Sequence, residues 1–256
     1  MSATKIFETG GYRFIPAVFQ YSSGVAALEG YAIRRHRLAR PVSLEEGFTL
    51  IGRTLQEAGR PLTAFCACEL RSPGQFSDAG FRAFNQHYVE TLRAWGLFDG
   101  ETNPVARSNV CPKVEAPRQT VFHAFSYTVP QNTIPTTSPA PSFVISGSGE
   151  ARAGDGPYAG RIIRLGDTSP DAMREKAAFV LGEMERRLAS FDMAWGDTTA
   201  THVYTLGDIH PFLETEIMRR GAGHAGIDWH FCRPPVEGLE YEMDCRAVHD
   251  EQVLAV

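Results

Sequence analysis

Cysteine is scarce in this 256-residue chain, and the chain has neither a long apolar run nor an excess of basic charge. The five cysteines form an odd set without CxxC spacing, which excludes a disulfide framework and predicts reduced, buried thiols. No stretch approaches the roughly 20 apolar residues of a membrane-spanning helix. The first residues also lack the apolar segment of a secretory signal. We therefore expect a cytoplasmic protein with no membrane partner.

The formal net charge of −5 gives no electrostatic footprint for nucleic acid, so we expect no nucleic-acid partner. Basic side chains cluster once, at Arg34, Arg35, His36, Arg37 and Arg40. A single short cluster in an acidic chain favours a solvated strand edge or an oligomer contact. Because no P-loop, Rossmann fingerprint, HExxH or GxSxG motif occurs, the sequence gives no support to nucleotide-binding, zincin or serine-hydrolase functions.

The clearest break in the chain is residues 129–142, which contain four prolines and several small polar residues. Proline cannot continue a helix or a central strand, so this segment is predicted to be a semi-extended linker. It separates residues 1–128 from residues 143–256, two predicted domains of similar length. This division suggests an internal repeat.

Hydrophobic periodicity and turn residues predict the same elements in both halves. In the first half we expect strands at residues 13–20, 30–38, 62–70, 106–111 and 120–129, and helices that begin after Ser43 (a capping box with Glu46) and Ser77. In the second half we expect strands at 143–150, 201–206, 227–232 and 240–248, and helices at 170–189 and 211–219. The predicted fold class is α+β, with two tandem β-β-α-β-α-β-β units whose helices lie on one face of a mixed sheet.

A sheet with helices on only one face leaves its other face uncovered. If that face is apolar, it must pack on another sheet. The tandem copy supplies one such sheet within the chain. Symmetric association of several chains can supply the rest and close a central barrel of sheets.

Three short passages resemble the Rid (YjgF-type) family of enamine and imine deaminases. Residues 143–150, FVISGSGE, resemble the family's early "SGQ" strand and turn, and residues 239–247, LEYEMDCRA, resemble its closing "VEIEA" strand. Residues 104–111, PVARSNVC, resemble the "PAR-S" segment that presents a carboxylate-binding arginine. The resemblance implies a chorismate-mutase-like, Rid-like fold, a homotrimer, and ligand sites in clefts between neighbouring units.

The motifs are divided between the two halves. Arg107 lies at the position of the family's substrate arginine, whereas the matching residues 224–230 contain no arginine. Glu242 matches the acidic residue of the closing strand, whereas the matching residues 121–126 of the first half contain no carboxylate. The resemblance therefore implies a cleft between unlike units that holds Arg107 and Glu242, with Glu240 as an alternative to Glu242. Without the resemblance, the acidic face of residues 240–244 would be interpreted as the solvent side of a sheet.

The implied activity is hydrolytic deamination of a small, carboxylate-bearing enamine or imine, such as a 2-aminomuconate-like intermediate of aromatic breakdown. Arg107 would hold the carboxylate bidentately, and Glu242 would orient the attacking water. Ser146 and Gly147 lie at a turn where backbone N–H groups can approach the substrate. An imine is already a good electrophile, so we expect no metal and no organic cofactor.

Two histidines are further candidates. His224, Asp228 and His230 are residue types that can form a metal site, but their spacing matches no known motif. We therefore expect His224 and His230 to act in hydrogen bonding or acid–base catalysis. Two other functions stay open: a chorismatase-like hydrolase, because residues 228–233 and 240–242 resemble chorismatase closing strands, and a non-catalytic protein that senses a carboxylate metabolite.

Overall fold

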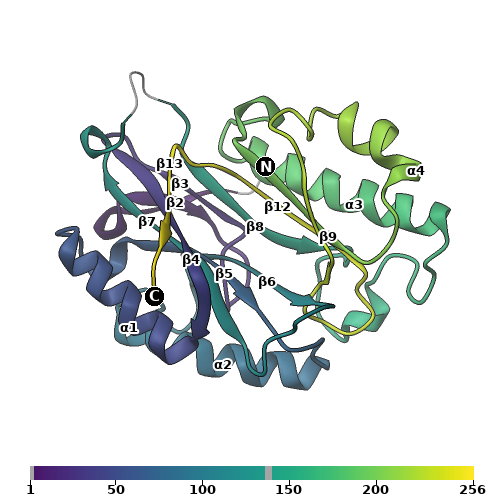
Figure 1. Cartoon of the computed structure of the whole chain (residues 1–256), viewed down its shortest axis with the longest axis horizontal. Helices are drawn as coiled ribbons and strands as arrows, with labels where there is room; N and C mark the ends of the chain where they lie inside the picture. The colour runs from purple at the N-terminus through teal and green to yellow at the C-terminus, as the bar shows by residue number, and fades with distance from the viewer. Residues whose placement is uncertain (1–2, 136–139) are drawn as a thin grey trace.

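In the computed structural model, which describes residues 3–135 and 140–256, the strands form two mixed sheets that pack against each other (Figure 1). One sheet has the order β1 (Lys5–Phe7), β2 (Tyr12–Ile15), β3 (Gly24–Ala27), β8 (Phe143–Gly149), β12 (Tyr241–Ala247), β9 (Ala200–Thr205) and β10 (Asp228–His230). The other has the order β11 (Cys232–Arg233), β6 (Ala106–Pro112), β5 (Phe65–Arg71), β7 (Val121–Pro130), β4 (Tyr31–Ser43) and β13 (Asp250–Leu254).

The helices lie on the outer faces of the two sheets (Figure 1). α1 (Leu44–Glu57) and α2 (Asp78–Ala94) pack on the sheet that contains β5 and β7, and the predicted capping box of Ser43 and Glu46 is present at the start of α1. α3 (Pro170–Ala189) packs on β8 and β12, and α4 (His210–Phe212) continues into a π-helical stretch, Leu213–Met218. The α+β class and the positions of the main helices are confirmed.

The two halves of the chain exchange strands. β1, β2 and β3 come from the N-terminal region but extend the sheet of the second half, where β3 pairs with β8. The second half was expected to begin with two strands, but only β8 precedes α3. Residues 151–169 contain Gly154, Gly156 and Pro157, which do not favour a strand, and β3 takes the place beside β8. The division at residues 129–142 stays a prediction, and residues 136–139 of that segment lie outside the described part.

The basic cluster of β4 does not lie at a solvated sheet edge, which was one of its two predicted positions, and the other, an oligomer contact, stays a prediction. β13 pairs with β4 in parallel and places acidic side chains against it. Arg34 Nε lies 2.6 Å from Asp250 Oδ2, and Arg35 Nη1 lies 3.2 Å from Glu251 Oε2. The chain's own last strand therefore neutralises much of the cluster.

The sheet faces that the helices leave free meet inside the molecule. An apolar cluster between them combines residues of both sheets, among them Phe14, Val25, Ile33 and Ala106. The expectation that the second sheet is supplied within the chain is thus confirmed, whereas the homotrimer stays a prediction. All five cysteines are free and buried. Among the described residues, no helix has the length and apolar character needed to cross a membrane.

Candidate active site

Arg107 of β6 is a buried cation that has no counter-ion among the described residues. Its side chain is surrounded by the rings of Tyr21, Phe81, Phe84 and Tyr88, whose centroids lie 4.7–5.9 Å from Cζ. Nη2 donates a hydrogen bond to Asn85 Oδ1 at 2.6 Å, and Nη1 is buried without a partner in the described part of the chain. Burying an unpaired charge is costly, so this guanidinium is well suited to bind an anion.

Ser146 and Gly147 of β8 connect Arg107 to the neighbouring strands. Ser146 Oγ accepts a hydrogen bond from the Arg107 backbone N–H at 3.0 Å, and the Gly147 N–H donates to Ser108 Oγ at 3.1 Å. A Cβ atom on Gly147 would lie 2.0 Å from Glu242 Oε1. The absence of a side chain at residue 147 therefore lets the Glu242 carboxyl group pack directly on β8. The structure brings Arg107, Ser146, Gly147 and Glu242 together, although their roles stay predictions.

Glu242 of β12 is buried, with 4% of its surface exposed. Burial, with the nearby carboxyl groups of Asp244 and Glu150, holds its pKa well above the usual value, against the opposing effect of Arg187 and Arg71. No residue in the described ranges donates a hydrogen bond to its carboxyl group, whereas Arg233 pairs with the alternative residue, Glu240, at 3.1 Å. Burial therefore favours the protonated form of the Glu242 carboxyl group.

Tyr21 and Arg187 belong to the same group of side chains, and the sequence analysis missed both. Burial raises the pKa of Tyr21, and the charges of Arg107 and Arg187 oppose that shift. Tyr21 lies in a loop without a recognisable motif. Arg187 does carry a signal, because it follows Met184 by three residues on the buried stripe of α3. A charged residue at such a position indicates a buried contact.

The structure does not place His224 or His230 beside Arg107. His224 is exposed in the turn region that precedes β10. His230 stacks on Tyr204 at 5.1 Å between ring centroids, and burial lowers its pKa to about 4. In the strand register, Tyr204 of β9 lies between Glu242 of β12 and His230 of β10. The backbones of Glu242 and His230 are therefore about 10 Å apart. In the described residues, no group of three or more His, Cys, Asp and Glu side chains could hold a metal ion.

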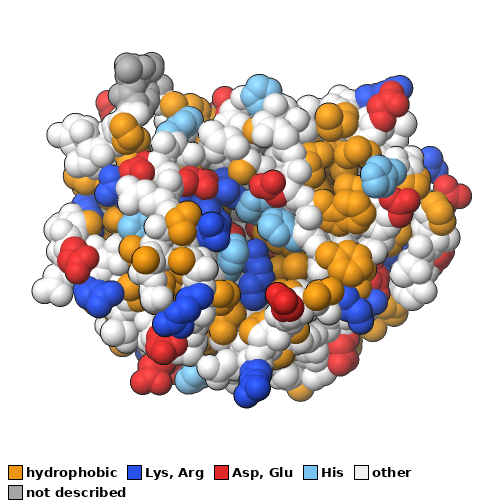
Figure 2. Space-filling view, in the orientation of Figure 1, with side chains coloured by type: hydrophobic (Ala, Val, Ile, Leu, Met, Phe, Trp, Pro, Cys, Tyr) orange, Lys and Arg blue, Asp and Glu red, His pale blue; other side chains and the backbone are white. Residues whose placement is uncertain are grey.

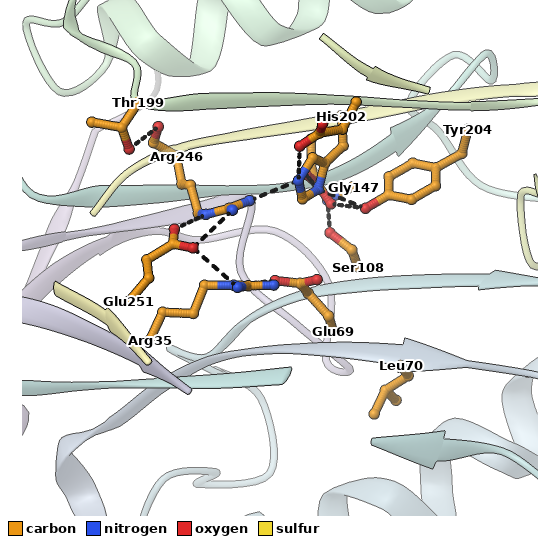
Figure 3. Close-up of polar contacts among 12 residues, drawn as sticks. Arg35, Glu69, Leu70, Ser108, Gly147, Thr199, His202, Tyr204, Arg246 and Glu251 are labelled. Carbon is orange, nitrogen blue, oxygen red and sulfur yellow. Dashed lines mark hydrogen bonds and ion pairs between the residues drawn. The ribbon is translucent and has the colours of Figure 1, made fainter. Parts of the chain in front are cut away.

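A second polar network lies between the sheets next to this site (Figure 3). Its carboxylate Glu251 bridges two arginines, at 3.2 Å from Arg35 and 2.5 Å from Arg246. Arg246 Nη1 can only donate, so His202 Nε2 accepts its hydrogen bond at 2.9 Å and Nδ1 carries the ring proton toward Asp244, 3.0 Å away. This network fixes β12, and with it Glu242, against β4 and β13. Figure 2 shows histidine and basic side chains gathered near the middle of this face.

Comparisons with known proteins agree with a deaminase. Residues 4–252 match the family described as 2-aminomuconate deaminase CnbZ. The chain is 50% identical over 251 residues to the 2-amino-5-chloromuconate deaminase of Comamonas testosteroni, with 97% of this chain and 98% of that protein covered. A chorismatase structure superposes with a TM-score of 0.50 and 11% identity over 92% of this chain and 81% of that one, which shows a shared fold alone. The chain therefore belongs to the 2-aminomuconate deaminase CnbZ family.

Proposed function

We propose that the protein hydrolyses a 2-aminomuconate-like enamine acid to a 2-oxo acid and ammonia. Family membership and the name of the 50% identical relative support the substrate class. The observation that carries the proposal is that a buried arginine, Arg107, and a buried acid, Glu242, lie on two strands that both contact β8 at residues 146 and 147.

Substrate binding is assigned to Arg107. Its guanidinium forms two parallel hydrogen bonds with a carboxylate and thereby fixes both the charge and the plane of the substrate. The four aromatic rings around Arg107 exclude water, which strengthens this ion pair. The amino-bearing carbon next to that carboxylate is then held near Gly147 and Glu242.

Glu242 first acts as an acid. It protonates the enamine carbon while the nitrogen lone pair forms the C=N bond, so the substrate becomes an iminium ion and Glu242 becomes a carboxylate. The carboxylate next takes a proton from a water molecule as the water oxygen attacks the iminium carbon. The carbinolamine then collapses to C=O: its hydroxyl proton is transferred to the amino group, the C–N bond breaks, and ammonia leaves. The pKa of Glu242, raised by burial, suits it to the first step, because the group must enter the cycle protonated.

Product analysis tests this reaction. We expect the wild-type protein to release one ammonia and form one 2-oxo acid for each 2-aminomuconate consumed. In D₂O, the initial product should carry deuterium on one face of the protonated carbon. Ammonia release without a 2-oxo acid would exclude hydrolysis. Binding of 2-aminomuconate without any ammonia release would instead indicate a sensing protein.

A further inference from the structure

Arg187 of α3 is a second buried cation that has no carboxylate partner among the described residues. Its side chain is 9% exposed. Nη1 donates to the Ser146 carbonyl at 2.9 Å, and Nη2 donates to Ser148 Oγ at 3.1 Å. Nε is buried and unpaired in the structure as described. Arg187 therefore retains hydrogen-bonding capacity at Nε, and its guanidinium, whose pKa is lowered by burial, forms no ion pair with a carboxylate of the described residues.

Arg187 and Arg107 both form hydrogen bonds with Ser146 of β8. Arg107 reaches Ser146 through its backbone N–H, and Arg187 reaches the carbonyl of that same residue. The charges of both arginines lower the pKa of Tyr21 against burial, and Arg187 acts in the same way on Glu242. Neither guanidinium forms an ion pair with a carboxylate in the described part of the chain, so the group holds two cations without paired carboxylates. Such a group is electrostatically complementary to a dianion.

We propose that Arg187 binds a second carboxylate of the substrate, so that the site selects dicarboxylates with one carboxylate at each end of the enamine. This inference rests on the proposed function and adds the reason for a dicarboxylate substrate. Arg107 would then bind the carboxylate beside the amino carbon, and Arg187 would bind the distant one. Both ends of a conjugated six-carbon chain would thus be fixed while Glu242 transfers its proton.

Arg161 is the other arginine near Tyr21, and its surroundings differ. It is only half-buried, and its Nη1 donates to the carbonyl of Arg152 at 2.9 Å, within its own loop. Its guanidinium also lies 4.4 Å from the centroid of the Tyr158 ring. These contacts hold the loop together. Arg161 is therefore engaged within its own loop, whereas Arg187 lies on α3 against β8.

Two ligands that cannot be deaminated allow binding of the second carboxylate to be measured independently of turnover. Muconate has no amino group and two carboxylates, whereas sorbate of the same double-bond geometry has a methyl group in place of one carboxylate. We expect the wild type to bind muconate roughly 30-fold more tightly than sorbate. In Arg187→Gln this preference should fall to near unity with little change in sorbate binding, and Arg187→Lys should restore part of it. Arg186→Gln, the neighbouring change on α3, should keep the preference.

Other results would overturn the assignment. Equal weakening of both ligands in Arg187→Gln and Arg187→Lys would mean that Arg187 only holds β8 in place. A preference that survives in Arg187→Gln but disappears in Arg161→Gln would assign the second carboxylate to Arg161. Because neither ligand can be deaminated, these results do not depend on the reaction. A wild type that prefers muconate but releases no ammonia from 2-aminomuconate would refute the proposed function and leave the dicarboxylate site intact.

Discussion

In the proposed mechanism, Glu242 serves activity at the expense of stability. In the folded protein its pKa is held well above the usual value, mainly by burial, which favours the neutral form. In the unfolded chain it ionises with an ordinary pKa of about 4.3. Between these two pKa values the unfolded state binds fewer protons than the folded state. The free energy of unfolding therefore falls as the pH rises through this window.

Glu242→Gln should accordingly make the protein more stable and less active. Glutamine keeps the neutral shape but cannot transfer a proton. We expect the melting temperature of the variant to exceed that of the wild type at pH 7, with the difference shrinking toward pH 4. Denaturation measured across this range would show it. Parallel stability curves for the two proteins would mean that Glu242 is ionised in the folded state. The wild-type kcat/KM should also fall as the pH rises through the Glu242 pKa.

At this scale the sequence predicted several residues that the structure brings together, although their roles stay predictions. Arg107, Ser146, Gly147 and Glu242 could be found because each lies in a short motif. Tyr21 could not be found, because its proximity to Arg107 depends on contacts between residues far apart in the chain. His224 and His230 were placed in the site by residue type alone, and strand register separates His230 from Glu242 by Tyr204.

Among the elements, β8 is the one that joins the two halves of the site. One of its neighbours is β12, which carries Glu242, and its serine and glycine contact Arg107 and Ser108 of β6. The other neighbour is β3, from the N-terminal region. Helix and strand periodicity predicted β8, α3 and β12 well because these are local patterns. The pairing of β3 with β8 and of β13 with β4 was missed because it depends on which edges meet in space.

Gly147→Ala tests the close packing of β8 on Glu242. The new Cβ would lie 2.0 Å from Glu242 Oε1 and must displace the carboxyl group. A shift of about 1 Å can cost roughly 100-fold in rate, so we expect a loss of that order in kcat/KM. Gly149→Ala on the same strand is the control, because its Cβ meets only the flexible Leu239 side chain at 3.1 Å. Equal losses in both variants would mean that the strand, and not the carboxyl group, is disturbed.

The whole molecule is held together across its two sheets by charge as well as by apolar packing. Glu251 of β13 lies between Arg35 and Arg246, which belong to different sheets. Without the Glu251 carboxylate, each of these two arginines would lose an ion pair. We expect Glu251→Gln to lower the free energy of unfolding by roughly 1–3 kcal/mol. Val253→Ala, an exposed change on the same strand, should have little effect in the same denaturation experiment. If both variants changed the free energy of unfolding by similarly small amounts, the ion pairs of Glu251 would not stabilise the fold.

Association of several chains is the remaining expectation at this scale. β10 and β11 are edge strands of the two sheets. Trp229 of β10 is 40% exposed, and Phe231, between the two strands, is 53% exposed. An open edge with exposed aromatic side chains is suited to a contact with another copy. We expect light scattering to give three times the chain mass of 28.2 kDa, and Phe231→Glu to reduce it. A wild-type mass equal to that of one chain would refute the homotrimer.

The most direct test of the central claim is ammonia release from 2-aminomuconate by the wild type, Arg107→Ala and Arg53→Ala. Arg53 is an exposed arginine of α1 that pairs with Glu57, so its loss controls for a change of charge. The account predicts release by the wild type and by Arg53→Ala, and a fall of roughly 100-fold or more in Arg107→Ala without unfolding. Wild-type activity in Arg107→Ala would contradict the site, and no release by the wild type would contradict the reaction.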